Sequence, residues 1–502
     1  MNRRDFLKAA TAAGVSITLG GCAESVGFSR KKQTKPNIVF FLVDDMGWQN
    51  TSEPFYKEVT PLNKKYHTPN MEALADEGVK FTQAYAYALC SPTRVSLMTG
   101  LSAARHRVTT WTLKKDFSYD RPHPTLNPPK WNINGLSPVP DVDGTCYANT
   151  FPMFLQKAGY RTIHVGKAHW GAQDTPGSDP KALGFDVNIA GHYAGGVGSH
   201  YARNNFGDTS DPIWDPPGLE EYYGKDMYLT EVLTIEANKQ MDKAVADGKP
   251  FYLYMSHYAT HAPFETDDRF SKKYQHAGLS GVDLAYATMI EGMDKSLGDI
   301  RANIKRLGIE DNTIVVFMTD NGAPDATPRN LPLKGHKLHS YEGGPRVPMI
   351  VKWPGVTKPD SICEDYMIVE DIFPTFLEMA GVKDYDQIGG KIDGISFVPL
   401  LKQKKGYPKD RPLFWHFPHN YVVEPFSVIR KGDWKLIYFY TDEHFELYNI
   451  KDDIGESNNL VDRNKDTLRS LADELRLFLI EANADMPIIK STEKPVPLPT
   501  VQ

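Results

Sequence analysis

Two pairs of oxygen-bearing side chains stand where apolar runs of the sequence end. Asp44-Asp45 follows Asn37 to Val43, and Asp320-Asn321 follows the run from Thr313 to Met318. Carboxylate and amide oxygens without a histidine or cysteine among them favour a hard cation, and Ca²⁺ accepts many oxygen ligands in flexible geometry. One such pair alone is typical of polar strand termination. Two pairs predict a divalent cation site, with Ca²⁺ as the first choice and Mg²⁺ as the alternative.

A third stretch, Cys90-Ser91-Pro92-Thr93-Arg94, combines a cysteine, a proline and an arginine in five residues. Pro92 suits the first turn of a helix that ends at Gly100, which would place residue 90 just before the helix N-terminus. The exposed amides and the dipole at such a terminus favour an anion. Taken alone, Cys90 is typical of a buried structural thiol and Arg94 of a solvated side chain. The role of this stretch therefore depends on its surroundings.

The run CSPTRVSLMTG resembles the CxPxR signature of type I sulfatases, which belong to the alkaline phosphatase-like superfamily. The resemblance implies that a formylglycine-generating or sulfatase-maturating enzyme converts Cys90 to Cα-formylglycine. Hydrated to a gem-diol, this group offers one oxygen to attack a sulfate ester and a second whose ionisation expels sulfate. The resemblance also implies that one divalent cation is held by Asp44, Asp45, Cys90, Asp320 and Asn321.

Two further elements match proton-transfer positions of this family. Gly166-Lys167-Ala168-His169 matches the GKxH element, which implies that Lys167 holds a sulfate oxygen and that His169 takes the proton whose removal releases sulfate. A histidine suits that step because its reference pKa of about 6.5 allows proton exchange near neutrality. His261, in Thr260-His261-Ala262-Pro263-Phe264, matches the histidine that contacts the bridging oxygen and protonates the leaving alcohol.

A second lysine and an arginine complete the implied anion site. Lys337 lies four residues before Tyr341-Glu342-Gly343-Gly344, where the family carries a sulfate-binding lysine. The residues on both sides of Lys337 depart from the family's glycine and threonine, and Lys334 competes for the role. Arg94 is implied to stabilise the hydrated formylglycine. Three other histidines are expected to be structural: His164, His192 and His200.

The elements that must position these residues alternate between strand-like and helical patterns. Near-continuous runs of valine, isoleucine and phenylalanine suit strands buried on both faces. The predicted strands are Asn37 to Val43, Arg161 to Val165, Phe251 to Met255 and Thr313 to Met318, with helices from Thr68-Pro69 to Gly78 and from Leu284 to Leu307. We expect an α/β fold with a large, mostly parallel sheet sandwiched by helices. Ligands bind beyond the carboxyl ends of such strands, so the polar clusters should meet at one edge.

The composition shifts between Gly394 and Asp410, which predicts a catalytic domain over 36–400 and a C-terminal subdomain over 401–502. Aromatic-rich strands are predicted at Pro412 to Phe417, Phe426 to Arg430, Trp434 to Tyr440 and Phe445 to Tyr448, followed by a helix from about Asn464 to Ala482. This small antiparallel sheet with one helix resembles the C-terminal subdomain of sulfatases. The resemblance covers roughly Pro36 to Asn483.

The first residues predict export. Asn2-Arg3-Arg4-Asp5-Phe6-Leu7-Lys8 carries a twin arginine before a short apolar stretch, as in Tat signals. Leu19-Gly20-Gly21-Cys22 resembles a lipoprotein cleavage box, which predicts a signal over 1–22, a lipidated Cys22 and a polar linker over 23–35. Simple cleavage with loss of Cys22 is the alternative. We expect a Tat-exported protein anchored by lipid alone in a bacterial envelope, on the periplasmic or outer-membrane surface.

The composition limits the partners of the chain. A formal net charge of −6 over 502 residues argues against bulk attraction to nucleic acid, so an anionic substrate needs a local cationic cluster. Of the four cysteines, Cys146 and Cys363 belong to no motif, and a disulfide and two buried thiols are both open for them. The sequence does not indicate an oligomeric state.

The expected reaction is hydrolysis of a sulfate ester. The expected substrate is a sulfated carbohydrate, because a surface-anchored enzyme meets polymers or their fragments before small metabolites. The segments Trp111 to Trp131 and His192 to Trp214 are long and poorly periodic, as functional loops often are. Their candidates for stacking on sugars or binding anions are Trp111, Lys114, Lys115, Trp131, His192, His200, Arg203 and Trp214. Each of these residues, taken singly, is more typical of an ordinary surface loop.

Two alternative functions remain. The same fold hosts phosphate and phosphonate monoester hydrolases. A two-zinc phosphatase would need further histidine ligands, including one beside Asp320, where Asn321 stands. The other alternative is a glycan-binding lipoprotein without turnover, which the complete set of matching catalytic positions disfavours.

Overall fold

The computed structural model of the chain describes residues 35–501 except 208–209, 325–329, 384 and 386–391. The described part belongs to one compact unit that begins at Lys35. The predicted signal with Cys22 and the linker up to residue 34 lie outside the described residues. Among the helices that the structure describes, none is long and apolar enough to cross a membrane.

A nine-stranded sheet occupies the centre, in the order β11-β2-β10-β9-β1-β8-β6-β7, with β12 also paired to β2. Its strands are β1 (Asn37–Val43), β2 (Val79–Tyr85), β6 (Arg161–Gly166), β7 (Val187–Ile189), β8 (Phe251–Ser256), β9 (Thr313–Thr319), β10 (Arg346–Lys352), β11 (Ser361–Cys363) and β12 (Met367–Ile368). Of these described strands, β10 alone runs against its neighbours. The predicted mostly parallel sheet is confirmed, and β1, β6, β8 and β9 match the predicted strands to within one residue.

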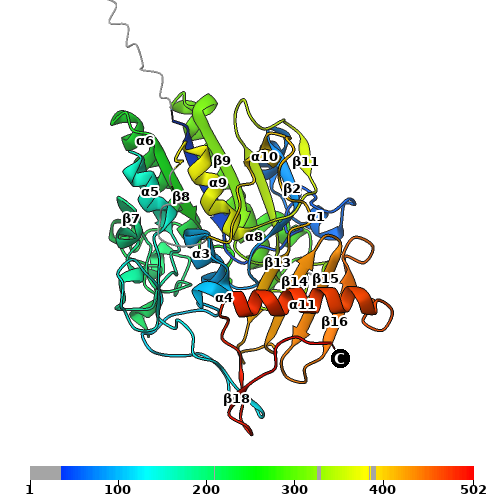
Figure 1. The fold of residues 1–502 in the computed structure, drawn as a ribbon. Coiled ribbons are helices and arrows are strands. Elements are labelled where there is room, and N and C mark those ends of the chain that lie inside the picture. The colour runs from blue at the N-terminus through cyan, green and yellow to red at the C-terminus, as the bar shows by residue number, and fades with distance from the viewer. Residues whose placement is uncertain (1–34, 208–209, 325–329, 384, 386–391, 502) are drawn as a thin grey trace, which may run out of the picture. The chain divides into compact units, whose positions relative to one another are not determined.

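Helices cover both faces of this sheet because its strands are apolar on both sides. In β1, Phe40 packs into one hydrophobic cluster and Phe41, the next residue, packs into the other. The first cluster includes α3 (Cys90–Thr99), α5 (Phe151–Lys157) and α9 (Ile372–Met379). The second includes α2 (Pro69–Asp76), α6 (Leu229–Ala246) and α8 (Gly281–Arg306). The sheet is therefore sandwiched, as expected (Figure 1).

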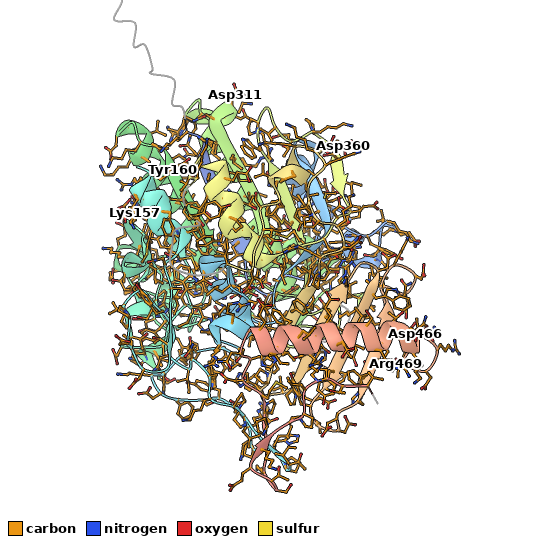
Figure 2. The ribbon with its side chains drawn as sticks, in the orientation of Figure 1. Lys157, Tyr160, Asp311, Asp360, Asp466 and Arg469 are labelled. Carbon is orange, nitrogen blue, oxygen red and sulfur yellow. The ribbon has the colours of Figure 1, made fainter. Side chains whose placement is uncertain are left out.

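The two ends of the strands differ in character. Tyr160, Asp311 and Asp360 stand just before β6, β9 and β11 and lie along the edge where these strands begin (Figure 2). At the opposite edge, Asp44 follows β1 and Asp320 follows β9. Because these two strands pair in parallel, their carboxyl ends reach the same edge.

A second sheet follows in the sequence, with β13 (Leu413–Phe417), β14 (Phe426–Lys431), β15 (Trp434–Phe439) and β16 (Phe445–Asn449) in antiparallel order. Helix α11 (Lys465–Glu481) lies across these strands (Figure 1), and Asp466 and Arg469 mark its outer end (Figure 2). The predicted small sheet with one helix is confirmed. Trp415 and Phe417 join the hydrophobic cluster that includes α3, and the boundary near residue 400 stays a prediction.

Shorter elements connect these layers. They are α1 (Pro61–Lys65), α4 (Ala103–His106), α7 (Ser271–His276), α10 (Val398–Leu401), β3 (Leu126–Asn127), β4 (Gly135–Ser137), β5 (Thr145–Tyr147), β17 (Ile488–Ile489) and β18 (Lys494–Pro495). Cys146 and Cys363 are both buried free thiols, so the question left open between a disulfide and two thiols is answered by two thiols.

Candidate active site

Three carboxylates from two strand ends meet at the carboxyl edge of the large sheet. One side-chain oxygen each from Asp44, Asp45 and Asp320 lies within 4.8 Å of the other two, and all three residues are buried. Asn321 donates from Nδ2 to Asp45 Oδ1 at 2.7 Å. Its own Oδ1 and Asp44 Oδ1 are buried and accept no hydrogen bond from the described residues. Buried oxygens without donors are costly, and an all-oxygen cluster with two of them fits a cation such as Ca²⁺.

Three cations balance these carboxylates. All three pairs are close: Lys167 Nζ to Asp44 Oδ2 at 2.6 Å, Lys337 Nζ to Asp45 Oδ1 at 2.7 Å, and Arg94 Nη2 to Asp320 Oδ2 at 2.8 Å. The first and third are fully buried, whereas the Lys337 side chain is 14% exposed. Burial works to raise the pKa of Asp45, yet Lys337 and His261 together hold it below its ordinary value. Burial and the neighbouring Asp320 raise the pKa of Asp44 well above its ordinary value. A divalent cation would make this balanced cluster net positive and suited to an anion.

Cys90 is the first residue of α3, one position further into the helix than expected. Its thiol is buried, and burial raises its pKa, so an unmodified Cys90 is a protonated thiol near neutral pH and a poor nucleophile. Thr93 fixes this first turn by donating from Oγ1 to the Asp320 backbone oxygen at 2.8 Å. Arg94 is completely buried and donates to Ser256 Oγ at 2.7 Å, so the alternative of a solvated arginine is wrong.

His169 lies three residues after the end of β6, where its backbone has a positive φ of 61°. Its Nε2 lies 2.8 Å from the carbonyl oxygen of Thr112. Because a carbonyl only accepts hydrogen bonds, Nε2 carries the proton and Nδ1 holds the lone pair of the neutral ring. Nδ1 is buried and has no hydrogen-bond partner among the described residues. Burial and Lys167 lower the pKa of His169 well below its ordinary value, which keeps Nδ1 available as a proton acceptor.

His261 shows the reverse arrangement. Its Nδ1 lies 2.8 Å from the carbonyl oxygen of Ala262, and its Nε2 lies 3.8 Å from Asp45 Oδ2. Nε2 is therefore the nitrogen that faces the carboxylate cluster. Burial and Lys337 lower the pKa of His261 to about 3.

The structure separates the two competing lysines. Lys337 Nζ reaches Asp45 inside the cluster. Lys334 Nζ instead lies over the Tyr341 ring, 3.7 Å from its centroid, and within 3.4 Å of the hydroxyl of Tyr448. Lys337 is therefore the lysine of the site, as the spacing to Tyr341 indicated. Lys334 helps pack this segment against the C-terminal sheet.

The three histidines assigned to structural roles are buried. His164 Nδ1 hydrogen-bonds Asn188, and His192 is 7 % exposed. His200 Nε2 lies 3.1 Å from the backbone oxygen of His261. His200 thus supports the segment that carries His261 without facing the cluster itself.

Sequence reasoning missed several residues that shape the site. Ser256, the last residue of β8, supports Arg94 and stands at a strand end like the predicted clusters. Gly195 lies so close to His169 that an added Cβ would come within 2.3 Å of the ring. The consecutive glycines 195 and 196 were the available signal for such a close approach. The Thr112 carbonyl gave no signal, because a backbone contact does not depend on residue type.

Comparison with known proteins gives a consistent result along the chain. Residues 36–382 match the family model Sulfatase, and residues 336–484 match the model N-sulphoglucosamine sulphohydrolase, C-terminal. A protein named sulfatase from Formosa agariphila is 30% identical and covers 93% of this chain and 92% of its own length. The N-acetylgalactosamine-6-sulfatase of Mus musculus is 31% identical over 76% of this chain and 68% of its own.

Solved structures agree with this result. Ps i-CgsB in complex with k-i-k-neocarrahexaose is similar at a TM-score of 0.70 and 26% identity, covering 89% of this chain and 93% of that chain. The phosphonate monoester hydrolase of Agrobacterium radiobacter has a TM-score of 0.60 at 19% identity, covering 90% of this chain and 96% of its own, and shares the fold.

Proposed function

Because this chain belongs to the sulfatase family and is a sulfuric ester hydrolase, we propose that it removes sulfate from a sulfated carbohydrate. The observation that carries the proposal is the cluster of three buried carboxylates and three cations at the first turn of α3, flanked by two histidines of opposite tautomer. Two similar proteins support the substrate class by their names, Ps i-CgsB with a carrageenan hexasaccharide and N-acetylgalactosamine-6-sulfatase.

The cation in this proposal is one Ca²⁺, with Mg²⁺ as the alternative. It would be held by residue 90 together with Asp44, Asp45, Asp320 and Asn321. These four residues supply oxygens, and two of the oxygens accept no hydrogen bond from the described residues. When bound, the cation supplies stabilisation of negative charge on the sulfate oxygens.

Residue 90 in this proposal is formylglycine, made by a maturation enzyme before export. Its hydrated form supplies the attacking oxygen. The position suits this chemistry, since residue 90 begins α3 and the charges of Lys167 and Lys337 act on it. Lys167, Lys337 and Arg94 would orient the sulfate group by charge-assisted hydrogen bonds, which are stronger than neutral ones.

The two histidines would divide the proton transfers. His261 Nε2 would take up a proton when an anionic sulfate ester binds and raises the pKa of the imidazole, and it would then give this proton to the departing alcohol. His169 Nδ1 would accept the proton whose removal lets sulfate leave, because that nitrogen holds a lone pair directed away from the Thr112 carbonyl.

We also propose that the chain is exported by the Tat route and anchored through a lipid on Cys22. The twin arginine and the Leu19-Gly20-Gly21-Cys22 sequence support this proposal. Native protein should fractionate with membranes and incorporate radiolabelled palmitate, and Cys22→Ser should release it. Recovery of the native protein wholly in the soluble cytoplasmic fraction would refute the proposal.

The decisive experiment compares p-nitrophenyl sulfate with p-nitrophenyl phosphate, followed by sulfated hexasaccharides prepared from carrageenan and from glycosaminoglycans. We expect sulfate release from the aryl sulfate and from at least one hexasaccharide, with little phosphate release. A preference for the phosphate ester would favour the phosphoryl hydrolase of the same fold. Binding of hexasaccharide without sulfate release from any substrate would favour the non-catalytic alternative.

A further inference from the structure

Four aromatic side chains form a continuous surface beside the active site. This aromatic patch consists of Trp111, Phe117, Tyr119 and Tyr421. Trp111 and Tyr119 are stacked with ring centroids 3.9 Å apart, while Phe117 meets Tyr119 edge-on at 4.8 Å and Tyr421 meets Trp111 edge-on at 6.0 Å. Phe117 is 51% exposed, and the other three are partly exposed. Rings left open to solvent in this way can stack on the apolar face of a sugar.

The aromatic patch is continuous with the catalytic residues. The residue after Trp111 is Thr112, whose carbonyl oxygen receives the hydrogen bond from His169 Nε2 and whose backbone nitrogen lies 3.4 Å from Ser91 Oγ. Trp111 and Tyr119 also pack against the small cluster that contains Ala194, beside Gly195. The aromatic patch therefore begins one residue from the carbonyl that fixes His169.

Positive charge accompanies the aromatic patch. Lys114 and Lys115 are exposed, and the guanidinium carbon of Arg121, also exposed, lies 5.3 Å from the centroid of Tyr421. Across the described residues, none of these three cations forms an ion pair with a carboxylate. Cations with no carboxylate partner are available to bind an anionic ligand.

The other predicted loop carries a cation that already has a carboxylate partner. Burial and the charges of Asp174, Asp211 and Asp215 raise the pKa of Tyr193 on this loop. Arg203 on this loop lies over the Tyr201 ring at 3.6 Å and pairs with Asp226. Because Arg203 is already paired, the loop lysines without a carboxylate partner among the described residues lie on the segment from 114 to 121, and anion binding by the second loop stays a prediction.

A set of hydrogen bonds around the buried His419, called here the clasp, holds the aromatic patch in place. His419 is fully buried, with Nδ1 3.1 Å from the Asp120 carboxylate and Nε2 2.7 Å from Thr109 Oγ1. The backbone nitrogen of Asn420 also donates to Asp120 Oδ1 at 3.0 Å. Asp120 follows Tyr119 and Asn420 precedes Tyr421, so the clasp joins the two segments that carry the patch. A surface fixed in this way loses little conformational entropy on binding.

We propose that the aromatic patch, with Lys114, Lys115 and Arg121, is a binding subsite for a sulfated oligosaccharide. A sugar next to the reacting one stacks on the exposed rings, and a second anionic group of the same chain binds the three cations. The inference rests on the proposed carbohydrate substrate and sharpens it, because it requires an oligosaccharide with at least two anionic groups. A sulfated monosaccharide would reach only the catalytic cluster.

The test uses the ratio of kcat/KM for a hexasaccharide to kcat/KM for p-nitrophenyl sulfate. Hexasaccharides from carrageenan and glycosaminoglycans that carry several sulfates are compared with the same chains carrying one. For the double variant Phe117→Ala/Tyr119→Ala we expect this ratio to fall about tenfold or more on every hexasaccharide that is a substrate. For Lys114→Ala/Lys115→Ala we expect a similar fall on the chains with several sulfates only.

Matched controls are Leu477→Ala on α11, where the side chain is 57% exposed, and Lys451→Ala, where it is 71% exposed. Both should keep the wild-type ratio, and thermal melts should show that all variants fold. Calorimetric titration of the Cys90→Ser form with the best hexasaccharide should show the same losses of affinity in the two double variants. Turnover of hexasaccharides with unchanged ratios would overturn the subsite alone. Failure of the wild type to release sulfate from any hexasaccharide, while the aryl sulfate reacts, would overturn the carbohydrate proposal and the subsite with it.

Discussion

At the scale of single residues, backbone carbonyls decide which nitrogen of each active-site histidine can react. His169 commits Nε2 to Thr112, and His261 commits Nδ1 to Ala262. The two neutral rings therefore present different unprotonated nitrogens to the same cluster, Nδ1 of His169 and Nε2 of His261, and His261 must take up a proton before it can act as an acid. A hydrogen bond from the other ring nitrogen to a backbone carbonyl fixes the tautomer, as a bond to a carboxylate does in other enzymes.

Replacement of His169 tests this assignment. We expect His169→Gln to lower kcat by about 10²- to 10⁴-fold, the usual contribution of a general acid or base. Burial and Lys167 keep the pKa of His169 well below 6.5, so the wild-type rate should not lose this base between pH 7 and pH 6. Single-turnover rates measured from pH 5 to pH 8 check both points. An acidic limb near pH 6.5 that disappears in His169→Gln would contradict the lowered pKa.

Cys90 gives a second prediction at this scale. We expect peptide mass spectrometry of active protein to show formylglycine at residue 90, and Cys90→Ser to bind substrate without normal turnover. Serine would leave a sulfate ester with no second hydroxyl to expel it. Full activity in protein whose residue 90 is entirely unmodified cysteine would defeat this prediction, because the buried thiol has a raised pKa.

At the scale of elements, the site exists because β1 and β9 pair in parallel and end together. The pairing aligns Val43 with Thr319, so Asp44 and Asp320 occupy equivalent positions on adjacent strands. Helix α3 then begins at the same edge, and Thr93 and Arg94 tie its first turn to Asp320. Strand register and helix start therefore fix the distance between the carboxylates and residue 90.

Asp320 allows the cation to be tested at this scale. Asp320→Ala would remove the partner of the buried Arg94 and so destabilise the fold, whereas Asp320→Asn keeps an acceptor and loses the charge. We expect Asp320→Asn to abolish activity with a much smaller change in thermal stability. We also expect elemental analysis to find one Ca²⁺ per chain, and activity lost to EGTA to return with Ca²⁺. Two zinc ions per chain would contradict the calcium proposal.

At the scale of the whole molecule, a buried charge network joins the two sheets. Lys435 on β15 lies 3.0 Å from Glu342 Oε1 and 2.9 Å from Glu456 Oε1, and all three side chains are buried. Glu342 follows the segment that carries Lys337, so the C-terminal sheet supports the active site through this network. Removing the cation would leave two carboxylates buried without it.

We expect Lys435→Met to lower the free energy of unfolding by about 3–5 kcal/mol, as when one partner of a buried ion pair is lost. The control is Lys431→Met, which removes a half-exposed pair with Glu474 and should change stability by less than about 1 kcal/mol. Urea denaturation at pH 7.5 measures both. Equal effects of the two variants would show that the buried network does not stabilise the fold.

Buried histidines make the molecule sensitive to acid. Burial lowers the pKa of six of them to about 3 or 4: His106, His164, His192, His200, His257 and His416. Below pH 6.5 the unfolded chain binds a proton at each of these histidines and the folded chain does not. Each histidine therefore lowers the free energy of unfolding by up to about 1.4 kcal/mol for every unit by which the pH falls. Glu370, whose pKa burial raises to about 8, offsets one of them.

The melting temperature should therefore fall steeply between pH 6.5 and pH 5. His416→Gln should make that fall shallower, because a glutamine amide does not titrate. Calorimetric scans across this range check the prediction. A melting temperature that stays level to pH 5 would contradict it.

The sequence alone determined the features that are local in the chain. Four strands were predictable to within one residue: β1, β6, β8 and β9. Short, near-continuous apolar runs of this length are typical of strands that are buried on both faces. The start of α3 was predictable because Pro92 lies in its first turn and Gly100 ends it. Parallel pairing then predicted that Asp44 and Asp320 meet, since a single rule connects strand ends to sheet edges.

Only the tertiary structure decided the contacts between segments that are remote in sequence. It chose Lys337 over Lys334 and placed the Thr112 carbonyl against His169. It also showed that Lys114 and Lys115 on one predicted loop are exposed, whereas Arg203 on the other pairs with Asp226. These outcomes depend on which irregular segments pack together, and irregular segments have no periodicity from which their neighbours can be predicted. Short motifs therefore predicted which residues carry the chemistry, whereas the fold decided the tautomers of the histidines and the charges and surfaces around the site.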